Sequence, residues 1–229
     1  MKYGVICAMD EEINSLHSAL KVTKESNING ITFYEGTINT TEIVLVRSGI
    51  GKVEAGITAA LLVTNFKVDA LIHSGSAGGI GQGLAVGDVV ISTQTLYHDV
   101  DATAFGYELG QLPGQPARFD ADQALINEIT VAGQQTGLTI KKGLIVTGDQ
   151  FVSSQAQIQT ILTHFPDALC CEMEGCAIGQ VAHQFNVPFV VIRAMSDVGD
   201  EDAGQSFDEF IIEAGKRSAQ MLLALFSKK

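Results

Sequence analysis

The feature that most constrains the fold of this chain is the alternation of short apolar runs with segments of helical periodicity. The run Phe189–Ile192 is continuously apolar, as in a strand covered on both faces. Within Asp10–Leu20, the apolar residues Ile13, Leu16 and Leu20 recur at helical spacing, and Asp10 is a plausible helix cap. Strands that alternate with helices predict an α/β fold with a central mixed, largely parallel sheet flanked by helices.

The same patterns predict structure along the whole chain. Predicted strands are Lys2–Ala8, Ile31–Thr37, Glu42–Arg47, Ala70–Ser74, Asp88–Tyr97, Thr139–Thr147, Leu169–Met173 and Pro188–Ala194. Predicted helices are Asp10–Leu20, Lys52–Phe66, Asp122–Thr136, Gln155–Leu162, Glu174–Phe185 and Phe207–Phe226. A long loop is expected over Asp99–Ala117. Because no linker, repeat or low-complexity segment interrupts the pattern, we expect residues 1–229 to form a single domain.

Composition excludes several classes of partner. The net charge of -12 disfavours binding to nucleic acids or anionic membranes. No apolar run is long enough to span a bilayer, and the apolar stretch near Met1 is too short for a signal peptide, so we expect a cytoplasmic protein. Cys170, Cys171 and Cys176 form no CxxC pair, which favours reduced, buried thiols over a zinc site.

Polar or glycine-rich clusters follow the predicted strands. They are Met9 with Glu12, Ser48–Gly51, Ser74–Gly79, Glu172–Glu174 and Arg193–Asp197. Sheets of this kind bind ligands at the carboxyl ends of their strands, so these clusters predict one site. Within them, the glycine cluster fits either a tight turn or a loop that a ligand approaches closely. Because Arg193 ends an apolar strand, we expect it to have an acidic partner inside the site.

Other motifs are weak. Gly49-Ile50-Gly51 is followed by Glu54, so the chain lacks the dinucleotide fingerprint at this point. His98, Asp99 and Asp101 fit a loop with capping acids better than a metal site. The remaining histidines are expected to be isolated and structural; they are His17, His73, His164 and His183.

Seven segments in order carry a more specific signal. They are Ala8–Glu12, Ser48–Lys52, Ser74–Gly79, Thr103–Tyr107, Gly148–Phe151, Glu172–Glu174 and Arg193–Asp197. Together they resemble the 5'-methylthioadenosine/S-adenosylhomocysteine nucleosidases of the nucleoside phosphorylase superfamily, as does Ser206–Phe210. The resemblance implies hydrolysis of these nucleosides, and of 5'-deoxyadenosine, in methionine salvage and S-adenosylmethionine by-product recycling. Asp10, Val152 and Ala102 stand where members often have Glu, Ile and Val, but none of these changes removes a group that the reaction needs.

The resemblance also implies roles for the polar residues. Asp197 would be the general acid that protonates N7 of adenine, which requires an apolar or anionic setting. Glu12 would be the general base that orients the attacking water, with Ser76 and Arg193 positioning that water. Glu174 would accept hydrogen bonds from the ribose hydroxyls and stabilise the positive charge developing on the sugar.

The remaining expected contacts line the substrate. By resemblance, Phe151 would stack on adenine and the backbone of Val152 would read the edge of the base. Met9, Ile50 and Phe207 would form an apolar subsite for the 5' thioether, and Met173 would pack on the ribose. Gly78 and Ser196 complete the expected substrate-binding set. The family forms homodimers in which the long loop completes the neighbour's pocket, here with Ala102, Phe105, Tyr107 and Pro113. No metal or organic cofactor is implied.

Two alternative functions fit the sequence less well. A purine nucleoside phosphorylase would need cations beside the sugar, for which Arg47 and Lys52 are the nearest candidates, but Asp10-Glu11-Glu12 would repel a phosphate dianion. A non-catalytic nucleoside-binding protein would have lost the acid, the base or the ribose carboxylate, and all three are present.

Overall fold

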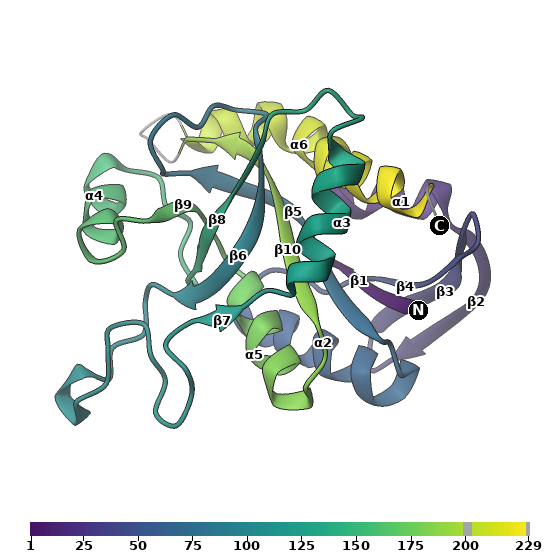
Figure 1. Cartoon of the computed structure of the whole chain (residues 1–229), viewed down its shortest axis with the longest axis horizontal. Helices are drawn as coiled ribbons and strands as arrows, with labels where there is room; N and C mark the ends of the chain where they lie inside the picture. Colours follow the sequence, from purple (N-terminus) through teal and green to yellow (C-terminus); the bar gives the residue numbers. More distant parts are fainter. Residues whose placement is uncertain (199–202, 228–229) are drawn as a thin grey trace.

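A mixed sheet forms the centre of the molecule in the computed structural model, which describes residues 1–198 and 203–227 (Figure 1). Its strands are β1 (Lys2–Cys7), β2 (Lys21–Ile28), β3 (Ile31–Ile38), β4 (Thr41–Arg47), β5 (Ala70–Gly79), β6 (Val89–Tyr97), β7 (Phe119–Asp120), β8 (Ile140–Thr147), β9 (Ala168–Glu172) and β10 (Phe189–Asp197). The predicted α/β fold class is therefore confirmed.

Strand β5 is the branch point of this sheet. It pairs in parallel with β1 and β10, and its last residues pair antiparallel with β9. Because β10 also pairs with β6, and β8 lies between β6 and β9, the five strands β5, β10, β6, β8 and β9 close into a ring. Strands β1, β4, β3 and β2 extend the sheet from β5. The topology brings the ends of β1, β5, β9 and β10 together.

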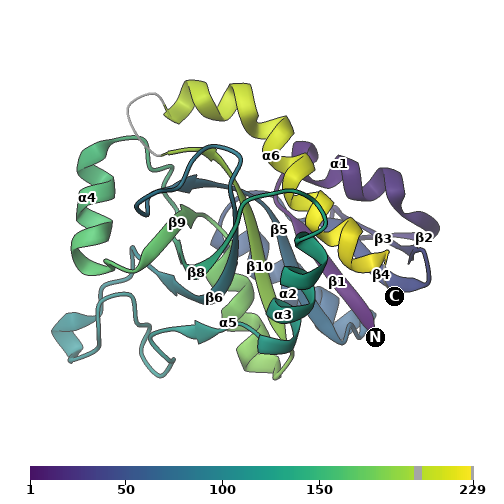
Figure 2. The ribbon, with the colours of Figure 1, turned by 45° about the horizontal axis from the view of Figure 1, so that its top comes forward.

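Helices cover both faces of the sheet (Figure 2). They are α1 (Asp10–Ala19), α2 (Lys52–Phe66), α3 (Gln123–Gly133), α4 (Gln155–His164), α5 (Gly175–Phe185) and α6 (Ala203–Phe226). Side chains alternate along β1, so that Tyr3, Val5 and Cys7 pack with α1, α3 and α6, whereas Ile6 faces the core under α2 and α5. Among the described residues, no helix has the length and apolarity that crossing a membrane requires.

The structure corrects three local predictions. Strand β2 was not predicted, because its residues are almost all exposed and show no apolar alternation. Helix α1 is capped by Met9 rather than Asp10, and Glu12 accepts a hydrogen bond from the N–H of Met9 in a capping box. Helix α6 begins at Ala203, before the predicted Phe207.

The glycine cluster forms neither the tight turn nor the loop that the sequence suggested. Gly75, Gly78 and Gly79 belong to β5, which continues in extended form where a turn or loop was expected. Pairing with β10 and β9 holds this segment in the sheet. A Cβ atom added to Gly75 would lie 2.6 Å from Oε1 of Glu12 and closer still to Arg193. The glycines therefore allow functional side chains, rather than a turn, to approach the strand.

Candidate active site

A cavity of about 350 Å³ opens at the carboxyl ends of the central strands. Every residue predicted for catalysis or substrate binding within one chain lines it: Met9, Glu12, Ile50, Ser76, Gly78, Phe151, Val152, Met173, Glu174, Arg193, Ser196, Asp197 and Phe207. They come from seven separate segments of the sequence. The residues that the sequence placed in one site therefore lie together around one cavity at the strand ends.

Glu12 is buried and held by hydrogen bonds at both carboxylate oxygens. Its Oε2 accepts from the backbone N–H groups of Ala8 (2.8 Å) and Met9 (3.2 Å). Its Oε1 accepts from the N–H (2.8 Å) and hydroxyl (3.0 Å) of Ser76. The Ala8–Met9 link between β1 and α1, together with the end of β5, therefore fixes the carboxylate in one orientation against the cavity.

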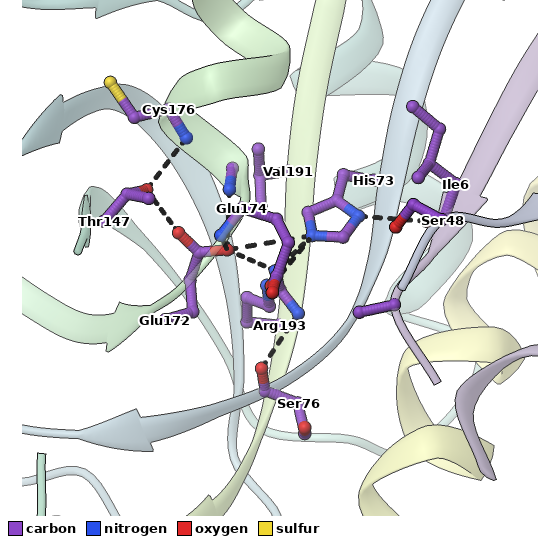
Figure 3. A network of polar contacts seen from close by, with 12 residues as sticks. Ile6, Ser48, His73, Ser76, Thr147, Glu172, Glu174, Cys176, Val191 and Arg193 are labelled. Atoms are coloured by element: carbon purple, nitrogen blue, oxygen red, sulfur yellow. Dashed lines mark hydrogen bonds and ion pairs between the residues drawn. The ribbon is translucent and has the colours of Figure 1, made fainter. Parts of the chain in front are cut away.

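Arg193 is the centre of a buried charge network (Figure 3). Its Nη2 contacts Oε2 of Glu174 at 2.9 Å, and also Oε2 of Glu172 and Nε2 of His73. Its Nη1 donates to the carbonyl of Ser76 at 3.0 Å and lies 3.8 Å from Oε1 of Glu12. Burial lowers the pKa of Arg193, but the three carboxylates outweigh burial and raise it. The acidic partner that the sequence predicted for Arg193 is present as three carboxylates, those of Glu12, Glu172 and Glu174.

The N-terminus of α5 positions two of these carboxylates. Oε2 of Glu172 accepts from the N–H groups of Glu174 (3.1 Å) and Gly175 (2.7 Å), and its Oε1 accepts from the hydroxyl of Thr147. Burial raises the pKa of Glu172, but Arg193 and His73 outweigh it and hold that pKa below its usual range. Glu174, the residue before α5, also accepts from the N–H of Gly51 at 2.8 Å.

Asp197 is the last residue of β10 and is 2% exposed. The hydroxyl of Ser196 donates to its Oδ2 at 2.8 Å. A Cβ atom at Gly78 would lie 2.9 Å from Oδ1 of Asp197 and 3.6 Å from the sulfur of Cys171. The absence of a side chain at Gly78 thus gives Asp197 its place beside the cavity.

Two parts of the cavity wall differ in character. We name Glu12, Ser76, Glu172, Glu174 and Arg193 the polar wall. We name Met9, Ile50, Phe151 and Phe207 the apolar wall. In the apolar wall, the ring centroids of Phe151 and Phe207 lie 5.7 Å apart in an edge-to-face arrangement. Phe151 is 46% exposed and Ile50 is 54% exposed. The site thus combines a fixed group of charges with an open apolar platform.

Lys52, at the start of α2, forms ion pairs with two loops beside the site, through Asp99 and Asp149. Its Nζ lies 2.9 Å from Oδ2 of Asp99 and 3.6 Å from Oδ2 of Asp149. Asp149 Oδ1 accepts from the N–H of Lys52, and Asp99 Oδ2 accepts from the N–H of Asp149. Asp101 accepts from the N–H and hydroxyl of Thr103. Asp99 and Asp101 are therefore pairing and capping acids, as expected.

From the sequence, some residues that lie at the cavity or contact its lining were given no site role, and others were named that lie away from this chain's cavity. His73 was predicted to be isolated but contacts Arg193, and Glu172 had been given no role. Gln150 and Cys171 also line the cavity. In the sequence, the only indication that Gln150 and Glu172 belong to the site was their position next to Phe151 and near Glu174. Ala102, Phe105, Tyr107 and Pro113 do not line this chain's cavity.

His73, Glu172 and Glu174 bring ligand atoms of the kind that metals prefer within 4.8 Å of one another. Nη2 of Arg193 contacts all three residues, so a guanidinium cation already occupies the place between them. All four cysteines are buried free thiols, as expected.

Comparisons with known proteins agree with this geometry. The family model of the phosphorylase superfamily matches residues 2–227. The 5'-methylthioadenosine/S-adenosylhomocysteine nucleosidase of Shewanella sediminis is 46% identical over 229 residues, covering 100% of both chains. The nucleosidase structure from S. pneumoniae, with the transition-state inhibitor MT-ImmA, is 50% identical with a TM-score of 0.95, covering 99% of this chain and 98% of that one. The S-adenosylhomocysteine nucleosidase structure from Streptococcus pyogenes, in complex with 5-methylthiotubericidin, is 46% identical with a TM-score of 0.97, covering 100% of this chain and 97% of that one.

The fold and the matched model define a member of the phosphorylase superfamily. Within it, the chain belongs to the 5'-methylthioadenosine/S-adenosylhomocysteine nucleosidases, whose full length it matches.

Proposed function

We propose that this chain hydrolyses the N-glycosidic bond of 5'-methylthioadenosine and S-adenosylhomocysteine, releasing adenine and the 5'-thio-substituted ribose. The observation that carries the proposal is that Glu12, Glu174 and Asp197 line one cavity in a chain that matches nucleosidases over its whole length. Cleavage with water needs a group that protonates the leaving base, a carboxylate near the sugar and a base for the water.

Each carboxyl group takes one of these roles. Asp197 protonates N7 of adenine, so the base does not leave as an anion. Glu12, held by Ser76 and by the backbone N–H groups of Ala8 and Met9, accepts the proton of the attacking water, and Ser76 and Arg193 position that water. Glu174 binds the ribose hydroxyls and stabilises the positive charge on the sugar in the transition state.

The apolar wall binds the two ends of the nucleoside. Phe151 stacks on adenine while the backbone of Val152 reads the edge of the base, and Phe207 supports the ring of Phe151. Met9 and Ile50 surround the 5' thioether, and Met173 packs on the ribose. A thioether has little hydration to lose, so an apolar subsite favours it over a free hydroxyl.

The positions of the lysines and arginines argue against the phosphorylase alternative. Among the lysines and arginines of residues 1–198 and 203–227, Arg193 alone lines the cavity, and three carboxylates surround it. Arg47 pairs with Asp10 at 3.0 Å, and Lys52 pairs with Asp99 and Asp149. A phosphate dianion would therefore meet anionic surroundings beside the sugar.

Adenine release from 5'-methylthioadenosine in phosphate-free, oxygen-labelled water tests the proposal. We expect prompt release of adenine and incorporation of the label at C1' of the methylthioribose. If adenine appears only after phosphate is added, with a sugar phosphate as co-product, the chain is a phosphorylase. Tight binding without any adenine release would identify a non-catalytic nucleoside-binding protein.

We further infer that the chain works as a homodimer. Val53 and Ile57 of α2 and Phe185 of α5 are 71%, 48% and 43% exposed, beside a hollow of about 340 Å³ between these helices. Exposed apolar surface of this kind is typical of an interface. This exposed surface lies close to the cavity, because Gly51, the residue before α2, donates a backbone hydrogen bond to Glu174.

A partner seated on this face would bring its long loop close to the cavity mouth. Phe105, 83% exposed in one chain, would then contact the neighbour's substrate together with Ala102, Tyr107 and Pro113. We expect Val53→Asp to give monomers with reduced activity in sedimentation and turnover assays. A fully active monomer would contradict the inference. Four free, buried thiols support a reducing compartment, and we propose the cytoplasm.

A further inference from the structure

His73 is a fully buried titratable group that the proposed mechanism does not use. It lies on β5 at 0% exposure, in register with Ile6 of β1 and Val191 of β10. It does not line the cavity, so it cannot touch substrate. Its ring nevertheless reaches Arg193, Glu172 and Glu174 (Figure 3). An action of His73 on the reaction must therefore pass through these side chains.

Hydrogen-bond chemistry assigns the protons of this ring. Nδ1 lies 3.0 Å from the carbonyl oxygen of Ile6, which can only accept, so Nδ1 carries a proton. Nε2 contacts Nη2 of Arg193, which can only donate, so Nε2 accepts. These two contacts together select the neutral ring with its proton on Nδ1.

We propose that neutral His73 is a positioning residue for hydrolysis, because it accepts a hydrogen bond from Arg193 and holds the guanidinium between Glu174 and Glu12. The inference rests on the proposed function and deepens it. With Nη2 fixed by His73, Glu172 and Glu174, the other amino group of Arg193 is directed at the carbonyl of Ser76 and toward Oε1 of Glu12. The ring thereby determines where Arg193 meets the attacking water.

The neighbours of His73 make this state sensitive to pH. The charged groups around it are Arg193 from β10, Glu172 from β9, Glu174 at the start of α5 and, beyond Arg193, Glu12 from α1. Cys7 follows Ile6 on β1, and burial raises the pKa of its thiol, which keeps it neutral. Burial and Arg193 lower the pKa of His73, but the hydrogen bonds that the protonated ring can donate to Glu172 and Glu174 outweigh them and raise it above its ordinary value.

Protonation would reverse the role of the ring. With a proton on Nε2, both His73 and Arg193 present donors to each other, and Nε2–H turns to the carboxylates of Glu172 and Glu174, 3.7 and 3.8 Å away. Arg193 then loses its fixed position. Activity should therefore fall as the pH drops through the raised pKa of His73, well above the range in which an ordinary carboxylate titrates.

The test compares the pH profile of kcat/KM in the wild type, His73→Gln and His73→Leu. The amide of glutamine can donate and accept but does not titrate, so we expect His73→Gln to retain most activity and to lose the inflection that His73 gives the wild-type profile. His73→Leu should lose the inflection and about 10- to 100-fold in kcat, because Arg193 loses an acceptor. Adenine affinity should stay within about twofold in both variants, since the ring is remote from the base.

A matched control separates this role from general effects of histidine replacement. His183, in the last turn of α5, packs edge-to-face on Phe119 away from the cavity, so His183→Gln should retain the wild-type profile. An inflection that persists in His73→Gln, or an unchanged kcat in His73→Leu, would overturn the inference. So would a parallel loss of kcat and adenine affinity, which would show a structural role only.

Two further outcomes are distinguishable. If His73→Leu fails to fold, the pH profile of His73→Gln alone decides the matter. If the wild type itself releases no adenine without phosphate, the proposed function fails first, independently of His73.

Discussion

In the polar wall, Glu12 and Arg193 are each 1% exposed and are held by groups from α1, β5, β9, β10 and the start of α5. In the apolar wall, Phe151 and Ile50 are about half exposed, and the ring of Phe151 packs edge-to-face on that of Phe207. The first region is held in place by contacts within the chain, whereas the second leaves apolar surface open for the substrate and for the proposed partner chain. We therefore expect the polar wall to control the chemical step and the apolar wall to control binding.

The largest effect should follow from removing a reacting carboxyl group. Glu12→Gln and Asp197→Asn should each lower kcat by about 100- to 10,000-fold, because each removes a proton-transfer group. Adenine affinity should change little in Glu12→Gln. The exposed neighbour Glu11 provides the control, since Glu11→Gln should have the wild-type kcat. Near-normal turnover in either active-site variant would refute that assignment.

Crowding the polar wall should be nearly as harmful. Gly75→Ala places a Cβ atom 2.6 Å from Oε1 of Glu12 and closer to Arg193, so both must move. A displacement of this size should lower kcat about 100-fold, with a loss of about 1–3 kcal/mol in the free energy of unfolding. Gly204→Ala meets nothing within 4 Å and should leave kcat unchanged. Equal kcat values for the two variants would show that the polar wall tolerates movement.

A change in the apolar wall should act on binding instead. Phe151→Ala should raise the Kd of adenine roughly three- to tenfold through lost stacking, with a smaller change in kcat. Phe210 is similarly exposed (41%) and does not line the cavity, so Phe210→Ala should bind adenine normally. Calorimetric titration with adenine measures both. An unchanged Kd in Phe151→Ala would remove Phe151 from the base subsite.

The smallest effect should come from the ion pair beside the site. Lys52→Met should lower the free energy of unfolding at pH 7 by about 0–1 kcal/mol. Burial raises the pKa of Asp99, but hydrogen bonds from Lys52 and the Asp149 backbone outweigh it and lower that pKa. This pair therefore contributes stability above the unfolded-state pKa of Asp99, and the contribution is lost as the pH falls through the folded-state pKa. Urea unfolding should show the difference from wild type at pH 7, and the difference should shrink as the pH falls below the unfolded-state pKa of Asp99.

The two walls also differ in how far the sequence predicted them. Glu12 and Asp197 follow predicted strands and lie in motifs, so both the strand-end rule and the resemblance placed them in the predicted site. Phe151 was placed there by the resemblance alone. His73 was missed because its contacts join β1, β5 and β10, and no local pattern encodes packing across three strands. Gly75 looked like a turn residue, whereas its role depends on side chains more than 60 and 100 positions away. Strand β2 lacks the burial that gives strands their alternation.

The most direct test of the division between the walls is to measure kcat and adenine Kd side by side in Glu12→Gln and Phe151→Ala. We expect a large loss of kcat with adenine affinity retained in Glu12→Gln, and weakened adenine binding with a modest change in kcat in Phe151→Ala. If both substitutions changed the same quantity by a similar factor, chemistry and binding would not be divided between the polar and apolar walls.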